Sequence, residues 1–262
     1  YPDLPKAYQI SQTKAPLCRD GFFTLESGKK IRINQIHIEE DAGKLVYDGD
    51  NICADYNRAG IPLIEIVTEP DFSSVAEVKE YLTMLRLTMK YLGISDCKMQ
   101  EGSMRSDVNI SCRGAGESTL GERTEIKNMN SIAFMAKAIE YEQERQIDII
   151  ESGGSVQQET LRYDDATNTT SSMRGEEDAN DYRYFRDPDL VTINVTDQEV
   201  EELEKTIPEL PDEKLERYVE KLGIPEPDAQ LLVKYRRVAE YFERASEGTA
   251  NPRTAANFII GQ

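Results

Sequence analysis

The sequence predicts an α+β fold in which a mixed region of strands and helices is followed by a purely helical one. Short apolar runs with strand-like alternation occur through the first two thirds of the 262 residues, and two long helical patterns lie among them. After residue 196 the chain shows only helix signals, which are punctuated by Pro208, Pro211, Pro225 and Pro227. We therefore place a mixed domain at residues 1–208 and the beginning of a helical domain at residues 209–262.

Five segments carry the apolar pattern of a β-strand. They are residues 31–38, 61–67, 105–112, 122–127 and 191–196. A turn at Ala42-Gly43 closes the acidic run that follows the first segment. Between residues 153 and 181 the composition changes to Thr, Ser, Asn, Asp and Gly, and residues 166–172 are typical of a hairpin tip or a loop.

Two long helices are predicted between these strands. The first covers residues 75–92, where Ser74 and Glu77 form a capping-box pattern and Gly93 is a natural stop. The second covers residues 132–150 and ends at a pair of glycines. In the helical region we expect shorter helices at residues 199–205, 213–222 and 228–247.

Composition excludes several classes of protein. The chain has 31 Lys and Arg against 49 Asp and Glu, a net charge of −18. Such a surface repels phosphate backbones, so we expect no DNA binding, and any RNA contact needs a local basic patch or another chain. The four cysteines form no CxxC pair, which argues against a zinc ribbon or a disulfide framework. No apolar stretch approaches membrane-spanning length.

The single histidine, His37, begins an acidic run that is the first candidate for chemistry. If the strand continues through this run, His37, Glu39 and Asp41 share one face; if it ends after Ile38, Glu39 and Glu40 lie together at its rim. Clustered carboxylate oxygens favour a hard cation such as Mg²⁺. The alternative is a solvated acidic turn beside a structural histidine, and spacing also leaves open a nucleophile system with His37 as its base.

Charged residues also line the predicted strands. Glu65 is the only charge in residues 61–67, and burying it without a partner would cost several kcal/mol. A sheet face that displays Glu65, Asp107 and Glu125 beside cations could hold Mg²⁺ by its carboxylates and phosphates by Lys and Arg. The candidate phosphate contacts on this basis are Arg105, Lys127 and Arg183. A plain solvated sheet face is the alternative, and no glycine-rich phosphate loop is present.

Several longer strings resemble a known family. They lie at residues 1–11, 37–44, 55–65, 101–109, 125–131, 181–185 and 207–211, and together they span the chain in the family's order. The sequence resembles the B subunit of the aspartyl/glutamyl-tRNA(Asn/Gln) amidotransferase. The resemblance implies a glutamine-synthetase-like antiparallel sheet, the catalytic cradle domain, followed by a helical domain.

The resemblance also implies an activity. ATP phosphorylates the side-chain carboxylate of Glu-tRNA(Gln) or Asp-tRNA(Asn), and ammonia that the amidase, the A subunit, releases then displaces phosphate. The expected cofactors are ATP and Mg²⁺, and the expected partners are the amidase, the C subunit of the complex and the misacylated tRNA. The expected location is the bacterial cytoplasm, with an organellar matrix as the alternative.

Residue by residue, the family's Mg²⁺-binding carboxylates match Glu40 and Glu65, with Glu125 a weaker member of the same catalytic and metal-binding set. Lys6 matches a position associated with the ammonia channel, and we group it with the candidate cofactor-binding residues Arg105, Lys127 and Arg183. The family's metal-binding histidine would precede Tyr1, so His37 is expected to orient the loop.

The sequence begins after one family motif and stops within the helical domain, so we expect a fragment that is inactive alone. The alternative for this fragment is a non-catalytic module for assembly and tRNA binding.

Overall fold

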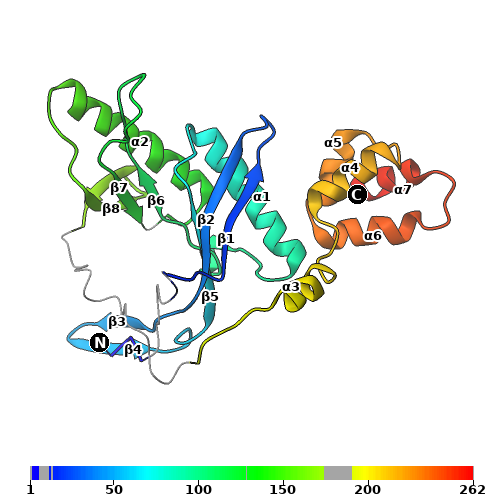
Figure 1. Ribbon diagram of the computed structural model, residues 1–262, viewed down its shortest axis with the longest axis horizontal. Helices are drawn as coiled ribbons and strands as arrows, with labels where there is room; N and C mark the ends of the chain where they lie inside the picture. The colour runs from blue at the N-terminus through cyan, green and yellow to red at the C-terminus, as the bar shows by residue number, and fades with distance from the viewer. Residues whose placement is uncertain (1, 6–11, 13, 128, 174–190, 262) are drawn as a thin grey trace.

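The computed structural model describes residues 2–5, 12, 14–127, 129–173 and 191–261. Strands and the two longest helices form the first part of the chain, and shorter helices gather in the second (Figure 1). Each part has its own cluster of buried apolar residues. The predicted α+β class is confirmed at this level.

The first sheet is antiparallel and has the order β1 (Cys18–Thr24), β2 (Lys30–Glu40) and β5 (Pro62–Thr68). β2 and β5 confirm the strands predicted at residues 31–38 and 61–67. The pairing of β2 with β5 shifts by one residue between Ile33 and Gln35. Because an extra residue in one strand reverses which positions face the core, this shift decides the orientation of every later side chain of β2.

The effect of the shift is visible in the pairs that follow it. Before the shift, the odd-numbered Ile31 is fully buried in the first core. After the shift, the even-numbered Ile36 pairs with Ile66, which packs against the same core. Directly opposed residues share a face. His37 and Glu65, the next pair, therefore point to the side away from that core.

A separate hairpin joins β2 to β5. It consists of β3 (Lys44–Asp48) and β4 (Asn51–Asp55), which pair only with each other in the described part of the chain. The sequence patterns did not predict these two strands, nor β1.

The second sheet has the order β6 (Val108–Ile110), β7 (Thr124–Lys127), β8 (Glu159–Asp164) and β9 (Thr169–Ser172). β7 and β8 are parallel, and helix α2 (Ile132–Glu151) connects them; the other pairs are antiparallel. The strands predicted at residues 105–112 and 122–127 are present but shorter. The hairpin tip predicted at residues 166–172 is the turn between β8 and β9 together with β9 itself.

Helix α1 (Val75–Leu92) has the predicted bounds. Ser74 Oγ accepts from the Glu77 amide, and Gly93 ends the helix in the left-handed conformation that glycine adopts without strain. The Glu77 carboxylate accepts from the amide of Ser73 and from Lys29 rather than closing the capping box on Ser74. Helix α2 (Ile132–Glu151) begins at the predicted residue, and both helices supply the first core.

The second part contains α3 (Asp197–Glu204), α4 (Pro211–Glu220), α5 (Glu226–Val233), α6 (Arg236–Ser246) and α7 (Pro252–Ile260). The last four pack around a core that includes Tyr218, Leu232 and Phe242. No helix among the described residues is long and apolar enough to cross a bilayer.

Two predictions for this part need correction, and one helix was missed. Residues 191–196 are not a strand: Val191, Ile193 and Val195 are exposed, and Thr196 caps α3 through a reciprocal contact with Glu199. The helix predicted at residues 228–247 is two helices, because the chain is extended at Tyr235. Helix α7 was not predicted, although Pro252 at its first position is a start signal.

Tyr91, near the end of α1, joins the two parts. Its side chain is 1% exposed, and its hydroxyl donates to the carbonyl of Val233 at 2.8 Å. Arg236 in turn donates to the carbonyl of Tyr91 at 2.8 Å. The break between α5 and α6 lies between Val233 and Arg236, and it allows both of these residues to contact Tyr91.

Candidate functional site

A wide cleft of about 2320 Å³ is lined by both sheets. β2 and β5 supply Glu39 and Glu65, while β6 and β7 supply Asn109, Glu125 and Lys127. In β7 the alternate residues Thr124 and Ile126 are buried, which leaves Glu125 and Lys127 on the cleft side. The charged faces predicted for separate strands thus line one cleft, and Arg105 and Asp107 also line it.

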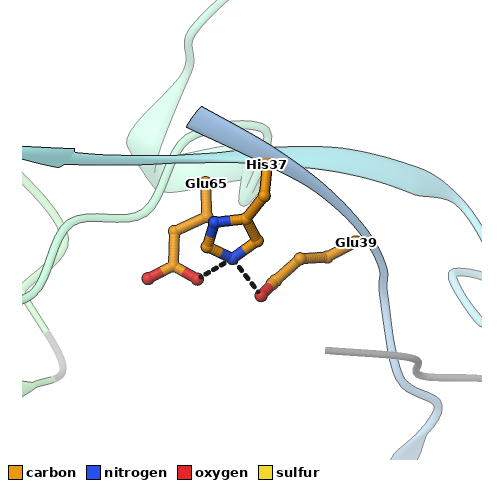
Figure 2. Close-up of side chains that lie close together, drawn as sticks. All are labelled: His37, Glu39 and Glu65. Carbon is orange, nitrogen blue, oxygen red and sulfur yellow. Dashed lines mark hydrogen bonds and ion pairs between the residues drawn. The ribbon is translucent and has the colours of Figure 1, made fainter. Parts of the chain in front are cut away.

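Two carboxylates that line this cleft converge on one nitrogen atom of the buried His37 (Figure 2). Nε2 of His37 lies 2.9 Å from Oε1 of Glu39 and 3.0 Å from Oε2 of Glu65. His37 and Glu39 are two residues apart on β2, and Glu65 is directly opposite His37 on β5. The strand therefore continues through the acidic run, the first of the two arrangements considered from the sequence.

The cluster carries more negative charge than its imidazole can balance. The side chains of His37 and Glu39 are only 3% and 7% exposed, whereas Glu65 opens to the cleft at 46%. Burial and the neighbouring Glu39 carboxylate raise the pKa of Glu65 to about 7, although His37 partly opposes both effects. A divalent cation would relieve the repulsion between the two carboxylates.

The donor set fits such a cation. One ligand atom from each of His37, Glu39 and Glu65 lies within 4.8 Å of the others. Two carboxylate oxygens are the ligands that Mg²⁺ prefers, and the imidazole nitrogen widens the choice to other divalent ions. No other such cluster occurs among the residues that the structure describes.

The structure does not bring together all of the predicted metal ligands. Glu40 pairs with Pro62 and points to the opposite face of β2 from His37, so it is not beside Glu65. Its Oε2 is buried and has no hydrogen-bond partner among the described residues. Glu125 lies on the second sheet, where it contacts Thr160 at 3.3 Å and Lys127 at 3.6 Å.

The predicted cofactor-binding residues are divided in the same way. Lys127 and Arg105 both line the cleft, and Arg105 donates to Oδ1 of Asp41 at 3.1 Å. Lys6 and Arg183 lie outside the described residues. Glu39 was not among the predicted ligands; the signal that identifies it is the alternation of His37, Glu39 and Asp41 along one strand face.

The two sheets thus frame a cleft with a histidine–carboxylate cluster of the kind that can hold a divalent cation. Comparison with known proteins makes the assignment specific. The model of the GatB/GatE catalytic domain matches residues 1–201. The chain therefore belongs to this family.

Curated relatives agree with the family match. The chain is 52% identical over its whole length to the B subunit of the aspartyl/glutamyl-tRNA(Asn/Gln) amidotransferase of Caldicellulosiruptor saccharolyticus, and covers 56% of that protein. It is 49% identical to the same protein of Caldanaerobacter subterraneus and 52% identical to that of Lachnospira eligens, again over its whole length and 56% of theirs. The chain thus spans about half the length of the relatives that it matches.

Proposed function

We propose that this chain carries the ATP-dependent part of tRNA-dependent amidation. The substrate would be Glu-tRNA(Gln), Asp-tRNA(Asn) or both, and the enzyme would be a carbon–nitrogen ligase. The family match and the names of the relatives support the reaction class. The observation that carries the proposal is the cluster of His37, Glu39 and Glu65 in the wall of a cleft that also displays cationic side chains.

The side chains of the cluster divide the work of holding a metal ion. Glu39 and Glu65 would supply carboxylate oxygens to Mg²⁺, and His37, buried between them, fixes the direction of both carboxylates. Bound Mg²⁺ neutralises charge on phosphate oxygens during phosphoryl transfer. Glu40, Glu125 and Lys6 stay proposals from the family resemblance, and Arg183 stays a proposal from the charged residues of the predicted strands.

Lys127 and Arg105, which line the same cleft, would contact phosphate oxygens. In the proposed reaction, a carboxylate oxygen of the aminoacyl side chain attacks the γ-phosphorus of ATP, so that ADP leaves and an acyl phosphate forms. Ammonia then attacks the acyl carbon, and inorganic phosphate leaves with the bonding electrons. The cleft of about 2320 Å³ is large enough for a nucleotide and an aminoacyl end together.

The architecture proposed with this function follows the family. Residues 1–208 would form the cradle domain with a glutamine-synthetase-like sheet, and residues 209–262 would begin the helical domain. The amidase would supply ammonia, the C subunit would complete the assembly, and misacylated tRNA would be the third partner. Because the relatives are bacterial, we place the protein in the bacterial cytoplasm.

The test replaces Glu65 by Gln in the complete amidotransferase, since the chain spans only part of its relatives. Glu65→Gln should abolish Mg²⁺- and ATP-dependent phosphorylation of the aminoacyl-tRNA. Glu69→Gln is the matched control, because Glu69 lines the same cleft and contacts Asn34 instead of the cluster. Normal phosphorylation by the Glu65 variant would refute the proposed function.

A further inference from the structure

A second charged cluster lies beside the candidate metal site and is built around Asp41. The Asp41 side chain is 13% exposed and lies between two guanidinium groups. Nη2 of Arg105 is 3.1 Å from Oδ1, and Nε of Arg58 is 3.6 Å from Oδ2. The two arginines come from different loops, one before β5 and the other before β6.

The backbone holds Asp41 in a fixed position. Its amide donates to the carbonyl of Ile61 at 2.9 Å, and its carbonyl accepts from the amide of Gly60 at 2.9 Å. These bonds extend the pairing of β2 and β5 past the last residue of β2. The carboxylate is therefore anchored to the sheet, and the two longer side chains are oriented by it.

Both arginines keep donors for a ligand. A guanidinium carries five N–H groups, and the contacts with Asp41 use Nη2 of Arg105 and Nε of Arg58. The two side chains are 61% and 44% exposed. The two cations share the Asp41 carboxylate, in a chain whose net charge is −18.

The two arginines also stand between two hollows of the surface. They line the main cleft and a smaller pocket of about 460 Å³. Acidic side chains line the smaller pocket as well: Glu101 is paired with Lys98 at 2.8 Å, Asp55 accepts from Asn57, and Asp107 is the third. Each arginine has more N–H groups than its contact with Asp41 uses, on a side chain that lines the cleft.

The spacing along β2 relates this cluster to the metal ligands. His37 and Glu39 occupy alternate positions on one face of β2, and Asp41 comes two residues after Glu39, where its amide still bonds to Ile61 of the neighbouring segment. Side chains two residues apart on a strand are separated by about 7 Å. This is close to the distance between a cation and a guanidinium that one phosphate group bridges. A polyphosphate chain that coordinates a cation at Glu39 would bring its next phosphate to Asp41.

We infer that Arg58 and Arg105, oriented by Asp41, form an oxyanion site for a phosphate group of the nucleotide whose metal ion is held at Glu39 and Glu65. The inference rests on the proposed function. It adds Arg58 to the residues that the sequence identified, and it gives Asp41 of the acidic run a role other than cation binding. Arg58 and Arg105 contact the phosphate, whereas Asp41 is a positioning residue.

Binding of inorganic tripolyphosphate with Mg²⁺, measured by calorimetry, tests the inference without any turnover. Arg58→Ala and Arg105→Ala should each weaken this binding by about tenfold or more, since each removes a charge-assisted contact. Arg58→Lys, which keeps the charge but loses the fork, should recover only part of the loss. Arg113→Ala is the control: Arg113 lines the same cleft but donates to the Ser118 carbonyl, and its removal should change affinity less than twofold.

Titration of Mg²⁺ alone separates this inference from the proposed function. Arg58→Ala should not weaken Mg²⁺ binding, whereas Glu65→Gln should. Tripolyphosphate binding that is equal in wild type and Arg58→Ala, with an intact melting temperature, would overturn the oxyanion site even where the metal site is real. A loss confined to binding of short single-stranded RNA would also overturn it, because the phosphate would then belong to RNA.

Discussion

His37 and Glu65 face each other directly across β2 and β5, and Nε2 of His37 lies 3.0 Å from Oε2 of Glu65. Glu39 approaches the same nitrogen atom at 2.9 Å. One imidazole N–H cannot fully satisfy two carboxylates, and their mutual repulsion is the reason that the cluster is suited to a cation.

The first prediction separates two adjacent carboxylates. Glu39→Gln should lower the affinity for Mg²⁺ by at least tenfold, because Glu39 belongs to the cluster, whereas Glu40→Gln should leave it within about twofold, because Glu40 points to the other face of β2. Calorimetric titration of the two variants measures this difference. The reverse order of effects would place the metal at Glu40, as the family resemblance implies.

The second prediction concerns pH. Because burial and the Glu39 carboxylate raise the pKa of Glu65 to about 7, Glu65 binds a proton below that pH, and a metal ion must displace it. The affinity for Mg²⁺ should therefore rise as the pH increases from 6 to 8. Glu65→Gln should remove this dependence.

A metal-free control checks the sign of the same shift. The ordinary pKa of glutamate is 4.5, and that of Glu65 in the folded state is about 7. Between these two pH values Glu65 keeps its proton in the folded state, whereas the unfolded state has released it. The stability contributed by this group should thus fall as the pH rises through that range. Thermal melts in EDTA measure this trend. A stability that rises with pH in wild type, but not in Glu65→Gln, would contradict the raised pKa of Glu65.

The ends of helix α1 could be predicted from the sequence, whereas the partners of His37 could be predicted only in part. Ser74 and Gly93 fix the ends of α1 through contacts within one turn, so the sequence alone contains them. The partner of His37 depends on the register between β2 and β5 and on the shift after Ile33, which no local pattern encodes. The family resemblance implied Glu40 beside Glu65, whereas the structure places Glu39 next to the His37–Glu65 pair.

Long-range contacts also account for the break at Tyr235. The apolar pattern runs through residues 228–247 as one helix, but Val233 and Arg236 both contact Tyr91 of α1. Local propensity could not reveal this contact between two parts of the chain. In the same way, the alternation of residues 191–196 is typical of a strand, yet a strand also requires a neighbour.

The third prediction concerns a buried network behind the cleft. Glu142 on α2 is fully buried, and it accepts from Thr124 of β7 at 2.9 Å and from Arg145 at 2.8 Å. Replacing Glu142 by Ala leaves these donors without their acceptor. We expect a loss of about 3 kcal/mol in the free energy of unfolding, which corresponds to a drop on the order of 10 °C in melting temperature.

Calorimetry of Glu142→Ala measures this loss, and Glu144→Ala, an exposed position of the same helix, is its control. Burial alone would raise the pKa of Glu142, but hydrogen bonds from Arg145, Gln146 and Thr124 outweigh it and lower the pKa. The stability that Glu142 contributes is present above pH 4.5 and is lost as the pH falls through the lowered pKa. The difference between wild type and variant should therefore shrink in acid; a constant difference would show that packing, not charge, holds the network.

The last prediction concerns the boundary near residue 208. All residues from 191 to 207 are exposed, whereas the cores on either side are separately buried. Limited proteolysis should cut within this stretch and leave a resistant helical fragment that begins close to Pro208.

The two fragments should stay associated after the cut, because the Tyr91 hydroxyl donates to Val233 and Arg236 donates back to Tyr91. A Tyr91→Phe change removes the first of these bonds and leaves the Val233 carbonyl without its donor, at a cost of about 1–3 kcal/mol. Gel filtration of the cut protein should then show separation at lower denaturant concentration than in wild type. Tyr81→Phe is the control, since its buried hydroxyl has no partner among the described residues and its ring packs in the first core. Equal separation in wild type and the Tyr91 variant would mean that other contacts hold the two parts together.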